Sequence, residues 1–126
     1  MFPVVTDPAK LPILFQDALN AGDVDGVLAL FAPDAGMRTV TGEHIAGAEA
    51  LRAEISGTVA ARGRLTNVRR HTLVGAETAL LVTDWTMEID GPGGERIAPT
   101  GTTANIARQY ADGGWRFTVL NPLGTA

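Results

Sequence analysis

Three side chains in the middle of the chain have types that could support proton transfer. Arg69 and His71 lie before a turn sequence, Gly75-Ala76-Glu77, and Asp84 lies after it. A tight hairpin at this turn places His71 opposite Val82 and Arg69 opposite Asp84, and opposite residues share one face of a sheet. An arginine keeps a neighbouring carboxylate ionised, and a histidine exchanges protons near neutral pH. We therefore take Asp84, His71 and Arg69 as candidates for general acid–base catalysis.

Other kinds of chemistry find little support in the composition. The chain has no cysteine and only two histidines, His44 and His71, so a thiolate nucleophile and a histidine-only zinc site are excluded. No phosphate-binding, dinucleotide-binding or zinc-protease motif is present, and we expect no cofactor and no metal. The net charge of −4 repels phosphate backbones, so we expect no nucleic-acid partner.

The length and hydropathy are typical of one globular domain. Hydrophobic residues make up 45% of the 126 residues and charged residues 19%, and a domain of this size buries enough surface to enclose a pocket. There is no run of 18 apolar residues, which argues against a membrane span. No cationic segment followed by an apolar one begins the chain. We expect a single domain over residues 1–126 that resides in the cytoplasm.

Helical signals come first along the chain. Asp7 followed by Pro8 is typical of a helix start, and Asp23 is a second N-cap candidate. Apolar residues recur at three- and four-residue spacing after each, and Pro33 is expected to end the second helix. The spacing predicts three helices: about 11–19, 24–31 and 48–61.

Extended segments dominate the second half. Segments rich in Val, Thr, Ile, Leu and aromatic residues alternate with Gly-rich turns, a pattern of hairpin-connected strands. The predicted strands are Leu65–Val74, Thr78–Ile89, Ile97–Tyr110 and Trp115–Leu120, with a shorter extended piece at Met37–Thr41. The order α-α-β-α-β-β-β-β is an α+β layout with helices on one face of a mostly antiparallel sheet.

Three stretches in this order resemble the nuclear transport factor 2-like superfamily, nearest its ketosteroid-isomerase-like and SnoaL-like branch. They are ALNAGDVDGVLALFAPDA (18–35), TGEHIAGAEALRAEI (41–55) and ADGGWRFTVLNP (111–122). The resemblance implies a cystatin-like cone, in which a curved antiparallel sheet has its concave face closed by helices around a pocket. It also implies a homodimer through the convex face. The superfamily contains several enzyme classes and non-catalytic binding modules, so the fold does not fix the function.

The catalytic positions of the steroid isomerases in this superfamily hold other residue types in this chain. The family's tyrosine position falls on Phe15 and its base position on Thr39, and neither side chain can perform the family role. The acid position falls at Ile106, or at Asn105 if the register slips by one. A standard steroid isomerase is therefore not expected.

The resemblance also implies which side chains face the pocket. It places Val82, Asp84 and Thr86 on the concave side, so that the catalytic candidates Arg69, His71 and Asp84 form part of one wall. The expected pocket-lining residues are Phe15, Thr39, Val82, Thr86, Val119 and Asn121.

Alternation along the strand at 78–89 supports a competing interpretation. The opposite set of residues is more apolar, and by alternation alone it would face the core: Leu81, Thr83, Trp85, Met87 and Ile89. A dimer interface that buries Trp85 and Met87 on the convex side would reconcile the two interpretations. A one-residue bulge would reverse every assignment.

Two kinds of function remain open. The first is a cofactor-free isomerase, cyclase, dehydratase or hydrolase that acts on a small hydrophobic ring-bearing metabolite by general acid–base catalysis. The second is a dimeric ligand-binding or assembly module without chemistry. Both place a small hydrophobic molecule in the pocket.

Overall fold

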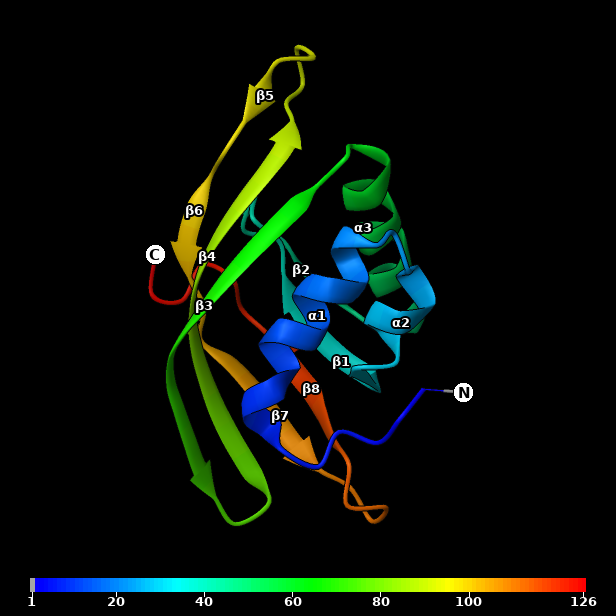
Figure 1. Ribbon diagram of the computed structural model, residues 1–126, viewed down its shortest axis with the longest axis vertical. Coiled ribbons are helices and arrows are strands. Elements are labelled where there is room, and N and C mark those ends of the chain that lie inside the picture. The colour runs from blue at the N-terminus through cyan, green and yellow to red at the C-terminus, as the bar shows by residue number, and fades with distance from the viewer. Residues whose placement is uncertain (1) are drawn as a thin grey trace.

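The computed structural model describes residues 2–126 and consists of a curved sheet with its helices gathered on one side (Figure 1). The elements in chain order are a 3-10 helix η1 (Pro8–Lys10), α1 (Leu11–Asn20), α2 (Val24–Leu28), β1 (Phe31–Arg38), β2 (His44–Ala46), α3 (Ala48–Ala60), β3 (Arg64–Gly75), β4 (Thr78–Asp90), β5 (Arg96–Ile97), β6 (Thr100–Thr102), β7 (Asn105–Gln109) and β8 (Trp115–Leu120). The α+β prediction is confirmed.

The sheet has the strand order β2-β1-β8-β7-β4-β3, and the short strands β5 and β6 pair with β4 as well. All pairs are antiparallel except β1 with β8, which are parallel. Since β2 and β3 stay at the two edges, the sheet curves without closing into a barrel. Among the described residues, no helix has the length and apolar character needed to cross a membrane.

The helix starts follow the predicted caps. The Asp7 carboxylate accepts a hydrogen bond from the backbone N–H of Ala9 at 3.0 Å, and Asp23 accepts one from Gly26 at 2.9 Å. A carboxylate in this position satisfies N–H groups that have no partner inside the helix. The third predicted helix is confirmed as α3.

The second helix is shorter than predicted, because Phe31, which was expected to be helical, pairs with another strand instead. α2 ends at Leu28, and Phe31 begins β1, where it pairs with Phe117 of β8. The strand therefore starts six residues before the predicted Met37. Pro33 is tolerated because the pairing with β8 is interrupted between Phe31 and Gly36, where no ladder N–H is needed.

The strand predicted over Ile97–Tyr110 is divided into β5, β6 and β7. One division contains Pro99, which lacks an N–H to donate. The other contains Thr103, whose side-chain hydroxyl accepts the N–H of Thr83 at 3.0 Å in place of a backbone carbonyl. The three-residue strand β2 was not predicted, since so short a segment carries no periodicity.

The hydrophobic core fills the space between the concave sheet face and the helices. Its largest fully buried side chains include Leu11 of α1, Leu51 of α3, Leu81 of β4 and Phe117 of β8. Burial alternates along the first half of β4, where Ala79, Leu81, Thr83 and Trp85 are buried and the residues between them are half-buried. The odd-numbered residues of β4 therefore face the helices.

Candidate functional site

A cavity of about 160 Å³ lies within this core, between the concave sheet face and the helices. The sheet contributes a row of odd-numbered β4 side chains: Thr83, Trp85, Met87 and Ile89. The helices contribute Pro12, Phe15 and Leu19 from α1 and Glu54, Ile55 and Thr58 from α3. Because most of these side chains are apolar, the interior suits an apolar guest.

Aromatic side chains form one end of the cavity wall. The rings of Phe15 and Phe117 border the cavity and lie edge to face, with centroids 6.1 Å apart, and Phe31 packs against both. Trp85 also borders the cavity, and its indole N–H donates to the Pro122 carbonyl at 2.8 Å. That bond fixes the plane of the indole, so this part of the wall is rigid.

Two residues with exposed side chains border the cavity and mark where it meets solvent. Val40 is 58% exposed, and Pro99 is exposed as well. Glu54, which is half-buried on α3, is the one titratable group among the described residues that line the cavity. The cavity therefore has one carboxyl group beside a mostly apolar lining.

Polar side chains occupy the part of the sheet where β4 meets β7. The Thr103 hydroxyl donates to the Leu81 carbonyl at 3.2 Å, and Asn105 Oδ1 accepts the N–H of Asn121 at 2.7 Å. The Thr83 hydroxyl is buried and has no hydrogen-bond partner among the described residues. Thr83, Thr103 and Asn105 all line the cavity.

A β-bulge changes the predicted pairing of the catalytic candidates. His71 does lie opposite Val82, but the register shifts between Arg69 and His71, so that Arg69 lies opposite Thr83 and Asp84 lies opposite Val68. The predicted Arg69–Asp84 pair is therefore wrong. The extra residue at the bulge is Arg70, and its Nε lies 3.6 Å from Asp84 Oδ2.

Asp84 lies on the convex face of the sheet, not in the cavity. Its Oδ1 accepts a hydrogen bond from Thr102 Oγ1 at 2.6 Å, across the β4–β6 ladder. Arg69 and His71 are exposed and take part in none of the side-chain hydrogen bonds found in residues 2–126. The placement of these three candidates on the cavity wall is corrected. Asp84 and His71 lie on the convex side, and Arg69, which lies opposite Thr83, does not reach the cavity.

The predicted lining residues divide between the two faces. Phe15 lines the cavity, whereas Val82 and Thr86 share the convex side of β4 with Asp84. Val119 is 40% exposed and lies opposite Ile106 on the same outer side. The placement of Val82, Thr86 and Val119 in the pocket is therefore wrong, because adjacent residues of a strand point to opposite faces.

Two further predicted lining residues support the structure around the cavity. Thr39 is buried, and its hydroxyl accepts the N–H of Glu43 at 3.1 Å, which shapes the turn after β1. Asn121 holds the side chain of Asn105 through its backbone N–H, and its own Nδ2 donates to the Gly124 carbonyl at 2.8 Å. Neither residue lines the cavity.

Sequence reasoning did not assign the polar and acidic lining residues to the pocket. For Thr83 and Trp85 the signal existed, since alternation along the strand favoured their face. Asn105 was considered only as a replacement for the family's acid. Glu54 lies on a helix whose apolar stripe gives no indication of a cavity. In residues 2–126 there is no group of three or more His, Asp and Glu side chains that could hold a metal.

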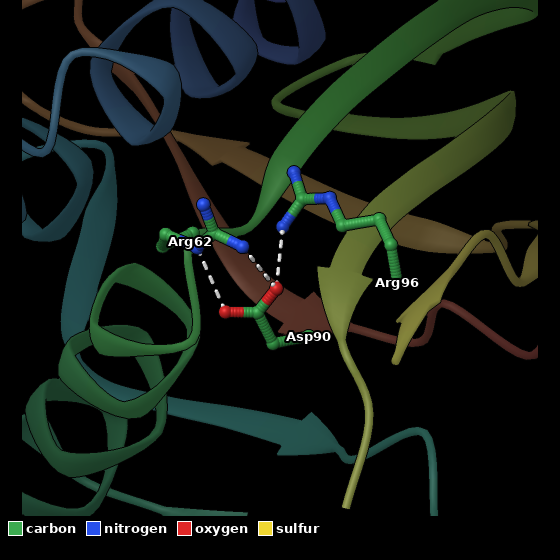
Figure 2. A network of polar contacts seen from close by, with 3 residues as sticks. All are labelled: Arg62, Asp90 and Arg96. Atoms are coloured by element: carbon green, nitrogen blue, oxygen red, sulfur yellow. Dashed lines mark hydrogen bonds and ion pairs between the residues drawn. The ribbon is translucent and has the colours of Figure 1, made fainter. Parts of the chain in front are cut away.

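A group of three charged side chains joins the turn that follows α3 to the far end of β4 and to β5 (Figure 2). Arg62 donates from Nε and Nη2 to the two carboxylate oxygens of Asp90, both at 2.8 Å, and Arg96 donates to Oδ1 at 3.2 Å. The hydrogen bonds from Arg62 lower the pKa of Asp90 to about 2. Since Asp90 follows the lining residue Ile89, this group ties together two walls of the cavity.

The fold of this chain is similar to the folds of several solved structures. A Thiobacillus denitrificans protein, provisionally described as a calcium/calmodulin-dependent protein kinase type II association domain, is 22% identical, with a TM-score of 0.79 over 99% of this chain and 100% of that one. An NTF2-like protein with a cystatin-like fold from Novosphingobium aromaticivorans is 16% identical (TM-score 0.74, 89% and 75% covered).

A third structure carries a suggested activity. This Streptomyces avermitilis protein of the NTF2-like family, provisionally described as a dehydratase, is 15% identical (TM-score 0.76), with 92% of each chain covered. No curated protein is significantly similar to the chain. The family model of the SnoaL-like domain matches residues 14–120. The chain therefore belongs to the SnoaL-like domain family, and its fold resembles that of solved NTF2-like proteins.

Proposed function

We propose that the protein binds one small, largely apolar molecule in the cavity between the sheet and α1 and α3. The observation that carries this proposal is the lining, which combines Phe15, Trp85 and Phe117 with aliphatic side chains around a volume of about 160 Å³. An engineered apolar cavity of about 150 Å³ takes up benzene. The volume therefore favours a guest the size of a single ring.

Nuclear magnetic resonance of the two tryptophan indoles tests this proposal. Trp85 lines the cavity, whereas Trp115 does not. Titration with toluene is expected to shift the indole N–H signal of Trp85 and to leave that of Trp115 in place. Equal shifts of both signals, or no shift of either, would contradict binding in the cavity.

A matched pair of variants on α3 locates the binding. Thr58 lines the cavity, whereas Ser56 is exposed on the same helix. Thr58→Phe is expected to weaken toluene binding at least tenfold, because the larger ring occupies the guest's volume, and Ser56→Phe is expected to leave it unchanged. Retained binding in Thr58→Phe would argue for a site elsewhere.

We propose as a second candidate that Glu54 transfers a proton on the bound molecule. A carboxylate beside an apolar cavity is a suitable general base or acid, and Glu54 is the titratable lining group described above. Removal of water from a substrate needs such a group, which fits the dehydratase description of the Streptomyces avermitilis protein. The catalytic candidates Asp84, His71 and Arg69 do not line the cavity and are not used in this proposal.

Once a turnover assay exists, two charge-removing variants test this role. Glu54→Gln keeps the size of the side chain and removes the base, so turnover should fall at least a hundredfold while binding persists. Glu49→Gln, on the exposed side of the same helix, should leave turnover unchanged. Full activity of Glu54→Gln would rule out proton transfer by Glu54, and only the proposed binding function would remain.

We further propose that the convex face of the sheet binds a second copy of the chain. Leu73, Leu80, Ile106 and Val119 lie opposite one another in register across β3, β4, β7 and β8. Leu73 is 59% exposed and Val119 is 40% exposed. An apolar row that crosses four strands is unusual on a face left to solvent and suits a self-complementary two-fold contact.

Sedimentation equilibrium tests the dimer directly. The unmodified chain is expected to sediment as a dimer at micromolar concentration, and Leu73→Glu should produce a monomer. Val74→Glu is the control, because Val74 is equally exposed but lies outside the row. A monomeric unmodified chain would overturn this proposal.

A further inference from the structure

We infer that the molecule in the cavity carries an amino group, and that Glu54 and Thr58 accept hydrogen bonds from its nitrogen. This inference rests on the proposed binding function and adds the chemical class of the ligand. It does not require that Glu54 transfer a proton. It comes from two side chains on one face of α3 that offer hydrogen-bond acceptors beside a mostly apolar cavity.

The first acceptor is the carboxyl group of Glu54. Glu54 lines the cavity and is half-buried, so part of its side chain is accessible. Its carboxyl oxygens take part in none of the side-chain hydrogen bonds and ion pairs among residues 2–126. Arg52, on the same helix, pairs with Asp25 at 2.7 Å. Arg62, in the turn after the helix, pairs with Asp90 at 2.8 Å, so these two arginines are already engaged by other carboxylates.

The second acceptor is the hydroxyl of Thr58. Thr58 also lines the cavity and is half-buried. Its Oγ1 donates to the backbone carbonyl of Glu54 at 3.1 Å. A hydroxyl has one hydrogen and two lone pairs. Because the hydrogen is used inside the helix, this oxygen can only accept from a ligand.

The spacing along the helix brings both acceptors within reach of one atom. Glu54 and Thr58 are four residues apart, and such residues lie on the same helix face with Cβ atoms about 5–6 Å apart. A hydrogen bond spans about 3 Å between its heavy atoms, so one nitrogen between the two side chains can donate to both. The bond from Thr58 to the helix backbone holds its oxygen in place before the ligand arrives.

Two neighbouring acceptors select an amine among small polar groups. An amino group carries at least two hydrogens in its primary form, whereas an alcohol carries one and donates only once. An amine and a carboxyl group form a hydrogen-bonded pair whichever of them holds the proton, and the ionised pair is the stronger one. An anionic ligand does not fit, because no cationic side chain lines the cavity within the described residues.

The indole of Trp85 is compatible with the same class of ligand. A Cβ at Gly101 would lie 2.7 to 2.9 Å from three atoms of this ring, Cζ2, Cε2 and Nε1, so one face of the indole lies against the backbone of β6. The opposite face is directed toward the cavity, which Trp85 lines. An aromatic face attracts a nearby cation. The sheet wall therefore tolerates an ammonium group that the helix wall binds.

Three probes with one carbon skeleton test this inference. Benzylamine, benzyl alcohol and ethylbenzene differ only in a terminal amino, hydroxyl or methyl group. Binding of each to the full chain is followed through the indole N–H signal of Trp85. Glu54→Gln keeps the size of the side chain and removes the carboxyl group, and Thr58→Val removes the hydroxyl at almost constant volume.

The two variants are expected to weaken the amine selectively. Glu54→Gln should weaken benzylamine by at least about tenfold, and Thr58→Val by about fivefold, the equivalent of one hydrogen bond. Benzyl alcohol should lose less than benzylamine in Glu54→Gln. Ethylbenzene should bind both variants as it binds the unmodified chain, which also shows that the cavity is intact.

The matched controls are Glu49→Gln and Ser56→Ala. Glu49 and Ser56 are exposed on α3 and do not line the cavity. These controls remove a carboxyl group and a hydroxyl group from the same helix. They should leave the affinities of all three probes unchanged, and a loss of benzylamine binding as large as in Glu54→Gln would contradict a direct contact with Glu54.

The outcomes separate the amino group from the binding function. If ethylbenzene binds but benzylamine does not, or if either Glu54→Gln or Thr58→Val leaves benzylamine unaffected, the amine inference is overturned and the binding function stands. Equal weakening of benzylamine and of either other probe by Glu54→Gln also overturns it, because one hydroxyl donor or the shape alone would then suffice. If no probe binds the unmodified chain, the binding function fails and the inference fails with it.

Discussion

The two faces of β4 share one backbone but differ in burial and in contact with the cavity. On the concave face Leu81, Thr83 and Trp85 are buried, and Thr83 and Trp85 border the cavity opposite the helices. On the convex face Leu80 and Val82 are half-buried, and Asp84 is paired with Thr102 and Arg70. Only one residue in two along this strand can belong to the site, whatever its chemical type.

The comparison shows that chemical type does not identify a site by itself. The residues with the most recognisable chemistry, Arg69, His71 and Asp84, lie away from the cavity. The polar and aromatic residues that border the cavity are threonines, asparagines, Glu54 and aromatic rings, and threonine, asparagine and aromatic side chains are also common in structural roles. Asp84 lies on the even-numbered face of β4, which is the convex one, and the bulge after Arg69 separates Arg69 from the face of His71.

The largest contrast between the two faces is expected from truncating adjacent leucines. Leu81 is 1% exposed and Leu80 is half-buried. Leu81→Ala should lower the free energy of unfolding by about 3 kcal/mol, because it opens a cavity in the core. Leu80→Ala should cost less than about 1 kcal/mol in the monomer, since less surface is re-exposed.

Urea denaturation at low protein concentration, with Leu73→Glu as the background, measures both values. This background removes the proposed dimer from the measurement. Similar losses for the two leucines would mean that the two faces of β4 are equally well packed.

A glycine beside Trp85 provides the next contrast. A Cβ at Gly101 would lie 2.7 Å from Cζ2 of the indole, whereas a Cβ at Gly57 on α3 would meet no atom within 4 Å. Gly101→Ala should therefore cost about 1–3 kcal/mol through overpacking and shift the Trp85 indole signal. Gly57→Ala should stabilise the helix by about 0.5–1 kcal/mol. An unchanged Trp85 signal in Gly101→Ala would show that the indole is not held by this wall.

The two buried threonines of the concave face, Thr83 and Thr103, are expected to differ in how much their hydroxyl groups stabilise the fold. Thr103→Val removes two hydrogen bonds and leaves the N–H of Thr83 without a partner, so it should cost about 1–3 kcal/mol. Thr83→Val removes a hydroxyl that has no partner, and its free energy of unfolding should be unchanged or higher. Thermal denaturation distinguishes the two, and a loss in Thr83→Val as large as that in Thr103→Val would contradict the assignment of its hydroxyl as free.

The smallest effect concerns the ion pairs at the end of β4. The folded pKa of Asp90 is lowered to about 2, so its contribution to stability is full above the ordinary carboxyl range and is lost as the pH falls from about 4 to about 2. Asp90→Asn should therefore flatten the pH dependence of the urea midpoint over this interval. Asp34→Asn, an exposed carboxylate, is the control and should leave the slope unchanged.

Much of the framework was predictable because it depends on local signals. The Asp7 and Asp23 caps, the three helices and the turns between the long strands each follow from a few adjacent residues. The exceptions are segments where distant contacts compete with local preference. Phe31 was predicted to be helical but pairs with Phe117 in the sheet. Thr103 was predicted to lie within a strand, but its side-chain hydroxyl accepts the N–H of Thr83 and the strand is interrupted there.

Local sequence patterns were enough to identify the family, most of the order of elements and the two alternating faces of the long strands. Which face of the sheet encloses the cavity depends on the helices that cover it, since helices can pack on either side of a sheet. Which β3 residues share that face depends on one extra residue, because a bulge exchanges the two faces of a strand. That extra residue, Arg70, leaves no mark in the local pattern. Its position is fixed by the pairing of β3 with β4 along their whole length.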